Sequence, residues 1–467
     1  MKKLTRSEKN KMIEKGKTAA IVVLCLCCLY FATAVVELYK GQISIGSFWG
    51  RNKTVTGISQ VTDNATQNVV NNFWQLSRPE TVLAVAGDDR RIIKETEADY
   101  QQIIEKINVT MRDVYSVGAE GILTSSEEQW RTCLTEDSVY VKFISPRDTA
   151  FEGLFYGVSA SGIAGVMENC REVVFVPAGN SQSVLTVYIR DAQDGKIVRL
   201  SMQTDTEIFK NAINNSVGRG REFSYGFETG IGGLASAFVV PDGEMKTNNI
   251  IISVPRIYKT GISFTKDTEV TSGLINLFGY NPNTVRQYED ANGALIYVGE
   301  TGSLKLNPNG KIEYKALSES EGVYIAPAGQ SSASAYSIVA GLLDMVDKIH
   351  ALSGVNDEKH HAEMKITDFG QDGMTFDYFV DGIKVAMGEE AAVSAVVKNG
   401  VLTEFRMWIK AIEKTENTTV NSAVLTSVQD YFSSNPDAKT VDDGDLIYIY
   451  NSDDNETSAV WDIRGEL

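Results

Sequence analysis

The chain has 467 residues, of which 43% are hydrophobic and 9% aromatic. That composition is typical of a folded protein of two or three domains and excludes a largely disordered one. The formal net charge is −17, and because residues 1–17 carry +5, the remainder carries −22. Nucleic-acid binding needs Lys and Arg to neutralise phosphates, so the acidic body argues against a nucleic-acid partner.

A membrane span is predicted directly after the basic N-terminal residues. Residues 18–36 read TAAIVVLCLCCLYFATAVV, 19 residues without a charge, and as a helix they reach roughly 28 Å, close to the hydrocarbon thickness of a bilayer. A basic tail stays in the cytoplasm, so residues 1–17 are predicted to be cytoplasmic and the long acidic part extracytoplasmic. The alternative is a cleaved signal peptide with Ala32-Thr33-Ala34 as its small-residue site. Because Val35 and Val36 continue the apolar run, a single-pass cell-membrane protein is the preferred interpretation.

The cysteines divide into two groups. Cys25, Cys27 and Cys28 lie in the predicted span, where a thiol serves as a small apolar packing group. Cys133 and Cys170 lie outside it and could form a disulfide in an oxidising compartment. The sequence does not show how closely their Cα atoms approach, so the bonded and the free state both stay open.

No constellation for catalysis or metal binding is evident. The three histidines, His350, His360 and His361, lie outside any metal-ligand spacing motif, although the adjacent pair could bind a metal weakly. The Gly-rich segments at 218–220 and 230–233 do not lie between a strand and a helix, as a phosphate-binding loop requires, and are interpreted as flexible loop. We therefore expect no catalytic residue, no bound cofactor and no metal site.

The extracytoplasmic part is predicted to contain two α+β domains after a juxtamembrane connector at residues 37–80, and its length would also accommodate three. In the first domain, residues 81–260, a strand at 81–86 precedes an amphipathic helix at 95–114 with apolar residues at helical spacing. Further strands are predicted at 139–144 and 173–176, and a hairpin at 184–189 and 197–202.

The second domain, residues 261–467, begins with a β-meander of four short strands between 286 and 314, which turns at Asn292-Gly293 and Asn309-Gly310. Asn-Gly is a strong hairpin signal because both residues tolerate a positive φ. A helix at 335–352, antiparallel strands between 364 and 412, a helix at 420–432 and two final strands at 446–450 and 459–463 follow. The expected fold class is therefore α+β, with one transmembrane helix and antiparallel sheets packed against helices.

In this context the chain resembles the YycH family, which belongs with YycI among regulators of the WalK sensor histidine kinase in Gram-positive bacteria. The resemblance rests on the element order and on three segments: LFGYNP through VRQYED at 277–290 with the strands up to Tyr314, FDYFVDGI at 376–383, and residues 148–155. The sequence departs from the family pattern at Ile383-Lys384, where the family has a Pro, in its longer tail, and in having Cys133 and Cys170.

The resemblance implies a non-enzymatic, membrane-anchored regulator of a sensor histidine kinase in a two-component system that controls cell-wall metabolism. Its partners would be a WalK-like kinase and a YycI-like protein. Helices in lipid associate through small residues, and Ala19, Ala20 and 32–34 provide such residues at both ends of the span. The alternative is an extracytoplasmic binding module for peptidoglycan or a peptide, in which sheet edges serve for docking. A wall hydrolase is disfavoured because no nucleophile has an evident base partner.

Overall fold

The computed structural model describes residues 79–466, apart from residues 96, 157, 159–160, 180–182, 192–193, 256–268, 326–334, 356–361, 371–372, 399 and 452–455. All of the described residues lie in one compact unit, Asn64–Leu467. The predicted tail, the span at 18–36 and nearly all of the connector lie outside the described residues. Among the helices that are described, none is long and apolar enough to cross a bilayer.

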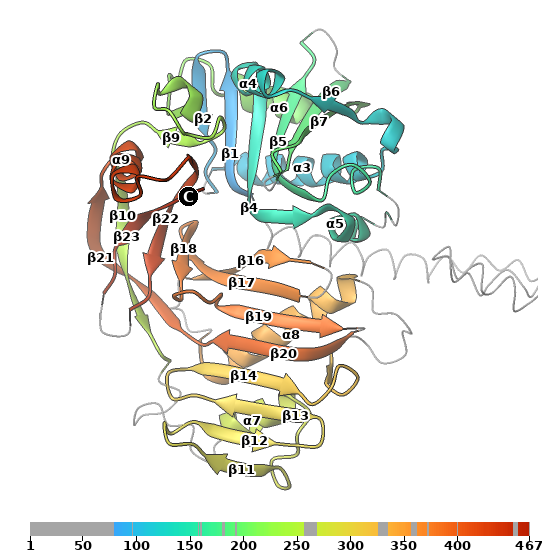
Figure 1. Cartoon of the computed structure of the whole chain (residues 1–467), viewed down its shortest axis with the longest axis vertical. Helices are drawn as coiled ribbons and strands as arrows, with labels where there is room; N and C mark the ends of the chain where they lie inside the picture. Colours follow the sequence, from blue (N-terminus) through green and yellow to red (C-terminus); the bar gives the residue numbers. More distant parts are fainter. Residues whose placement is uncertain are drawn as a thin grey trace, which may run out of the picture. The chain divides into compact units, whose positions relative to one another are not determined.

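The first half is built on a seven-stranded antiparallel sheet with the order β2-β1-β4-β5-β6-β7-β3 (Figure 1). It contains the predicted strands and the predicted hairpin. Its strands are β1 (Pro79–Ala86), β2 (Asp89–Ile92), β3 (Leu123–Ser125), β4 (Ser138–Asp148), β5 (Asn169–Pro177), β6 (Val184–Arg190) and β7 (Ile197–Gln203).

Both faces of this sheet are buried, because successive side chains of a strand point to opposite faces. In β1, Val82 and Ala84 belong to a cluster with α3 (Tyr100–Tyr115) and α6 (Glu207–Asn214). Leu83 and Val85 belong to a second cluster with Trp130 of α4 (Glu127–Thr135). The helix at 95–114 was thus predicted correctly apart from its start. The sequence interpretation missed α4, α6 and α5 (Thr149–Phe155), each of nine residues or fewer.

The second half is built on a twelve-stranded sheet with the main order β11-β12-β13-β14-β20-β19-β17-β18-β22-β23. Inward-facing residues such as Leu304, Ile312 and Phe405 are buried in the cluster that contains α7 (Glu269–Leu277) and α8 (Ala335–Ser353). The strands of the main order are β11 (Arg286–Glu289), β12 (Leu295–Val298), β13 (Gly302–Leu306), β14 (Lys311–Ala316), β17 (Gly373–Val380), β18 (Ile383–Ala386), β19 (Val393–Lys398), β20 (Val401–Trp408), β22 (Thr440–Ile449) and β23 (Ala459–Glu466). Two further strands, β15 (Val323–Tyr324) and β16 (Glu363–Phe369), pair with β20 and β17.

The hairpin predictions at the two Asn-Gly pairs are confirmed. Gly293 lies between β11 and β12 with φ +78°, and Gly310 lies between β13 and β14 with φ +87°. A side chain at residue 310 would also meet the carbonyl oxygen of Ile409, since an added Cβ would lie 2.8 Å from it. Glycine is therefore required there by both the backbone conformation and the close approach of the Ile409 backbone.

Three expectations about the second half are corrected by the structure. The last of the strands predicted between 364 and 412, at residues 401–412, is two strands, because the chain leaves the large sheet after Trp408 and β21 (Ala411–Asn421) pairs with β10 (Met245–Ser253). The predicted helix at 420–432 is α9 (Val424–Ser434), because residues up to Asn421 belong to that ribbon. The sheet is not wholly antiparallel, since β18 and β22 pair in parallel.

The two halves share one buried hydrophobic cluster, which includes residues of both sheets and of α3, α6, α7 and α8. The α+β fold class is confirmed, with seven α-helices among the described residues. The predicted division at 260/261 falls in residues 256–268, outside the described residues, and it stays a prediction. The shared cluster nevertheless implies that the described parts of both predicted domains unfold together.

We predict that Leu342→Ala lowers the free energy of unfolding by about 2–5 kcal/mol, because it leaves a cavity in the shared cluster. Leu342 is fully buried on α8. Urea denaturation of the purified chain in detergent, followed by tryptophan fluorescence, measures the change. Leu317→Ala is the matched control, since Leu317 is 68% exposed and its truncation should change stability by about 0.5 kcal/mol or less. Two separated transitions in the wild type would contradict the shared core.

Candidate functional site

Charged side chains from the two sheets meet in a buried network. Lys142 of β4 lies between Glu80 of β1 and two carboxylates of β22, Asp443 and Asp445. Its Nζ is 2.9 Å from Glu80 Oε2 and 3.3 Å from Asp445 Oδ1, and it also donates to Asp443 Oδ1. Lys142 and Asp443 are 301 residues apart in the chain and both are buried. We call these residues, together with Arg171 and Arg464, the junction network.

The two arginines complete the network around Asp443. Arg171 of β5 donates to Asp443 Oδ2, and Arg464 Nη2 of β23 donates to the same oxygen at 3.1 Å. Arg464 also donates to Asp445. Asp443 therefore accepts hydrogen bonds from three cations that come from three different strands, and this joins the β22–β23 hairpin to the seven-stranded sheet.

Irregularities in the strands direct these side chains into the junction. The register of β1 against β4 shifts between Pro79 and Thr81, so Glu80 is an extra residue in the ladder. The register of β22 against β23 shifts between Val441 and Asp443, which places Asp443 opposite Arg464. An extra residue in one strand re-aims its neighbours and strengthens the local twist. The polar sequence around Asp443 is therefore a strand, although the sequence interpretation placed the strand only from residue 446.

The pKa values of two acids in the network, Asp443 and Glu80, are shifted in opposite directions. Burial by itself raises the pKa of Asp443, but the charges of Lys142, Arg171 and Arg464 hold it well below its usual range. Burial, together with the nearby charge of Asp445, raises the pKa of Glu80 to about 8. The pKa of Lys142 lies above its usual range because the three carboxylates outweigh its burial. Near neutral pH the network therefore contains ionised Asp443 and mostly protonated Glu80.

This acidic group could also be considered as a metal site. The carboxylate oxygens of Glu80, Asp443 and Asp445 lie within 4.8 Å of one another. The ammonium group of Lys142, however, contacts all three carboxylates and supplies the positive charge that a metal ion would supply. The geometry is that of an internal ion-pair network, and no metal chemistry is derived from it.

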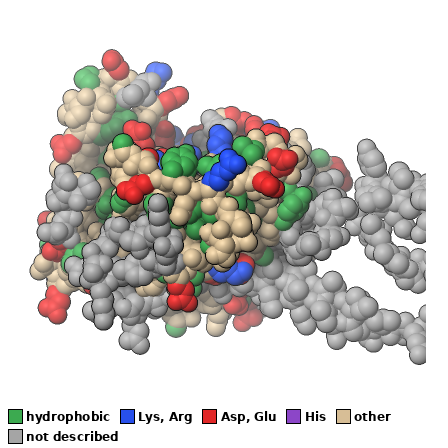
Figure 2. All heavy atoms as spheres, turned by 90° about the horizontal axis from the view of Figure 1, so that it is seen from below, with side chains coloured by type: hydrophobic (Ala, Val, Ile, Leu, Met, Phe, Trp, Pro, Cys, Tyr) green, Lys and Arg blue, Asp and Glu red, His purple; other side chains and the backbone are tan. Residues whose placement is uncertain are grey.

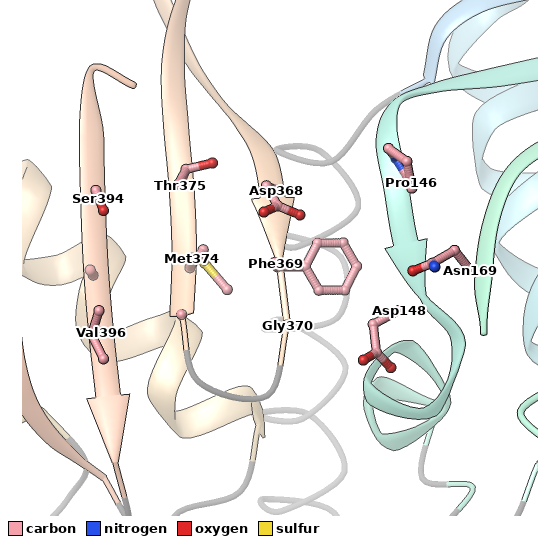
Figure 3. Close-up of a pocket in the computed structure, with 12 residues that line it drawn as sticks. Pro146, Asp148, Asn169, Asp368, Phe369, Gly370, Met374, Thr375, Ser394 and Val396 are labelled. Atoms are coloured by element: carbon pink, nitrogen blue, oxygen red, sulfur yellow. The ribbon is translucent and has the colours of Figure 1, made fainter. Parts of the chain in front are cut away.

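A pocket of about 340 Å³ lies at another part of the junction, between the ends of β4 and β5 and the strands β16, β17 and β19 (Figure 3). The ring of Phe369 points across the gap toward Asn169 and Asp148 (Figure 3). Burial raises the pKa of Asp368. The pocket offers carboxylate, amide and hydroxyl groups beside apolar ones, and its principal lining residues are Asp148, Asn169, Asp368, Phe369, Thr375 and Ser394.

Two further contacts connect β16 of the large sheet to the first half. Lys365 Nζ of β16 donates to Glu95 Oε1 at 2.8 Å, and both side chains are largely shielded from solvent. The rings of Phe151 on α5 and Phe369 on β16 pack with their centroids 5.6 Å apart. The junction therefore combines ion pairs with aromatic packing, which favours a single relative placement of the described parts of the two halves.

The two cysteines considered for a disulfide are both free and buried. Cys133 lies on α4 in the cluster on one face of the seven-stranded sheet, and Cys170 lies in the cluster on the other face. A disulfide does not form because the sheet separates the two thiols. Among the histidines, His350 is buried and its Nε2 lies 3.0 Å from Tyr378 Oη, whereas His360 and His361 lie outside the described residues.

The sequence interpretation did not identify the junction network. Its six residues occupy three separate regions of the chain, and charged residues in strands are usually exposed. A detectable signal was the density of acidic residues at 442–445, directly before an apolar strand.

The fold is shared with a solved structure. The chain is similar to the crystal structure of YycH from Bacillus subtilis with a TM-score of 0.52 and 12% sequence identity, over 84% of this chain and 95% of that one. The chain therefore has a YycH-type fold, as the resemblance in its sequence implied. No protein-family model matches the sequence. No curated protein shows a significant match either.

We predict that Asp443→Ala lowers the free energy of unfolding by about 3–5 kcal/mol, because it leaves Lys142 and Arg171 buried without their common acceptor. Asp344→Ala is the matched control. Asp344 pairs with Lys348 on the exposed face of α8, and the loss of such a surface pair changes stability by about 0.5 kcal/mol. Chemical denaturation measures both variants. Equal effects would show that the network contributes little to folding.

A second prediction concerns pH. Folding raises the pKa of Glu80 from the usual 4.5 to about 8, so between these values the folded chain binds a proton that the unfolded chain has lost. Stability linked to Glu80 is therefore complete below pH 4.5 and falls as the pH rises toward 8. Relative to Glu80→Gln, which keeps a neutral group of the same shape, the wild type should lose on the order of 2–4 kcal/mol between pH 5 and 8. Parallel pH profiles of unfolding for the two proteins would refute this.

Proposed function

We propose that this protein is a membrane-anchored, extracytoplasmic regulator of a sensor histidine kinase in a two-component system that controls cell-wall metabolism. The observation that carries the proposal is the YycH-type fold, which extends over 84% of the chain. The sequence adds a basic tail and an uncharged apolar segment at 18–36. In the proposed topology the N-terminus lies in the cytoplasm of a Gram-positive cell and the folded unit lies outside the membrane, and the basic tail supports this orientation.

The chemistry of the described residues is consistent with a regulator. The junction network pairs its acids and bases with one another, in an arrangement that joins two sheets. A regulator acts by binding two conformations of its target with different affinity, which requires an interface and a well-defined shape rather than a reactive centre. The junction network and the shared core supply such a shape.

The anchor is proposed to take part in binding. Apolar residues at 18–36 would lie beside the transmembrane helices of the kinase, and the outer domains would pair with a YycI-like partner. Helix association in lipid depends on close packing, which the small residues Ala19, Ala20 and Ala32 allow. Because both contacts belong to one chain, a weak helix contact and a weak outer contact would reinforce each other.

A second candidate function rests on the junction pocket. An extracytoplasmic module that binds peptidoglycan or a peptide would need a polar cavity, and the pocket at Asp148, Asn169 and Asp368 is such a cavity. Its volume of about 340 Å³ is near the lower end for small-ligand sites. The regulator remains the first proposal because it accounts for the fold and for the predicted anchor together.

We predict that the tagged full-length protein, solubilised from membranes of its own cells and pulled down, recovers a sensor histidine kinase that mass spectrometry identifies. A variant in which residues 18–36 are replaced by an unrelated apolar span of equal length should recover at least about tenfold less kinase, since one lost helix contact of about 1.4 kcal/mol has that effect. The control is an unrelated protein with the native residues 1–36 fused to it. Absence of a kinase from every pull-down would contradict the proposal.

A further inference from the structure

The outermost strand of the twelve-stranded sheet, β11, has a free edge. It pairs with β12 on one side, and among the described strands none pairs with its other side. All four of its residues are exposed. Figure 2 looks onto this end of the molecule from below, where hydrophobic side chains lie in small groups between acidic and basic ones. An unpaired strand edge is a template for pairing with another chain.

The backbone of β11 presents a regular set of hydrogen-bonding groups at this edge. The N–H of Asp290 donates to the carbonyl of Ala294 at 2.9 Å, so residue 290 directs its backbone groups inward. The pairing of β11 with β12 has no register shift, and backbone groups alternate in direction along a strand. Gln287 and Glu289 therefore direct their N–H and C=O groups outward, away from β12.

An apolar patch lies next to this edge on the outer face of the sheet. Tyr288 is 52% exposed and pairs with Ile296, and the neighbouring Val298 is 37% exposed. Further into the sheet the same face is charged, because Ile296 pairs with Lys305 and Lys305 with Glu313. The apolar residues of this face are thus concentrated near the free edge, where the side chains of a neighbouring strand would contact Tyr288.

We propose that β11 pairs antiparallel with β11 of a second copy of this chain, about a two-fold axis at Tyr288. This axis is perpendicular to the sheet, so the outer faces of the two copies lie on the same side of the combined sheet. Because the axis passes beside residue 288, two residues that lie opposite each other have numbers that sum to 576. Gln287 then lies opposite the partner's Glu289 and exchanges two backbone hydrogen bonds with it, and the symmetric pair adds two more. The two sheets become one continuous sheet, and two copies of the apolar patch meet at the axis.

Charge complementarity selects this register. Arg286 lies opposite the partner's Asp290, and the amide of Gln287 lies opposite the carboxylate of the partner's Glu289. The Oδ2 atom of Asp290 already lies 3.1 Å from Lys305 Nζ, and the carboxylate has further lone pairs that can accept a hydrogen bond from a second cation. An axis at Glu289 would instead place two carboxylates opposite each other, which is destabilising. An axis at Gln287 would leave Arg286 opposite a tyrosine.

Disulfide trapping tests the axis. The test protein is the full-length chain with Cys25, Cys27 and Cys28 replaced by Ala, and its two remaining cysteines are buried. With Tyr288→Cys, the two thiols would come from directly opposed residues with Cα atoms about 4.5 Å apart, within disulfide range. Under mild oxidation this variant should form covalent dimers at least about tenfold faster than Tyr324→Cys, a control at a 73% exposed tyrosine on β15. Equal rates would overturn the proposal.

Charge reversal tests the register. Arg286→Glu would place glutamate opposite the partner's Asp290 at both ends of the strand pair, so the dimer dissociation constant measured by analytical ultracentrifugation should rise about tenfold or more. Arg219→Glu, at an exposed arginine in the loop after α6, is the matched control and should leave the constant unchanged. Equal effects of the two reversals, or a wild type that stays monomeric at every concentration, would overturn the proposal.

Discussion

The contact between Lys142 and Asp443 is the interaction on which the arrangement of the two sheets depends. It joins β4 to β22 across 301 residues of sequence, and both side chains are buried. A buried ion pair adds little net stability, because desolvation offsets much of the Coulomb attraction. Its main consequence here is specificity: any placement of the β22–β23 hairpin that separates Asp443 from Lys142 and Arg171 removes the acceptor that these two cations share.

Hydrophobic packing and the junction network have complementary roles. The shared cluster extends through both sheets and supplies the non-directional part of the stability. The relative placement of the two halves is set by directional contacts. These are the junction network, the Lys365–Glu95 pair and the packing of Phe151 on Phe369. The result is one compact unit in which the junction network lies near β22–β23 at one end of the large sheet, and the free edge of β11 lies at the other end.

The sequence predicted best where local signals were strong. The Asn-Gly turns located two hairpins, and apolar residues at helical spacing located α3 and α8. The short helices α4, α5 and α6 were missed, because seven to nine residues contain too few turns for a clear period. The ribbon of β10 and β21 was missed for another reason: its strands are polar and mostly exposed, and they are distant in sequence. The fold family itself was recognisable from the element order.

The sequence alone predicted the long helices α3 and α8, the two Asn-Gly turns and the membrane anchor, because each depends on residues that are close together in the chain. Only the tertiary structure decided which charged residues are buried together and whether Cys133 meets Cys170. It also decided which strand has a free edge. Those outcomes depend on pairing between distant strands, and the register shifts beside Glu80 and Asp443 that direct the junction network are not revealed by any local pattern.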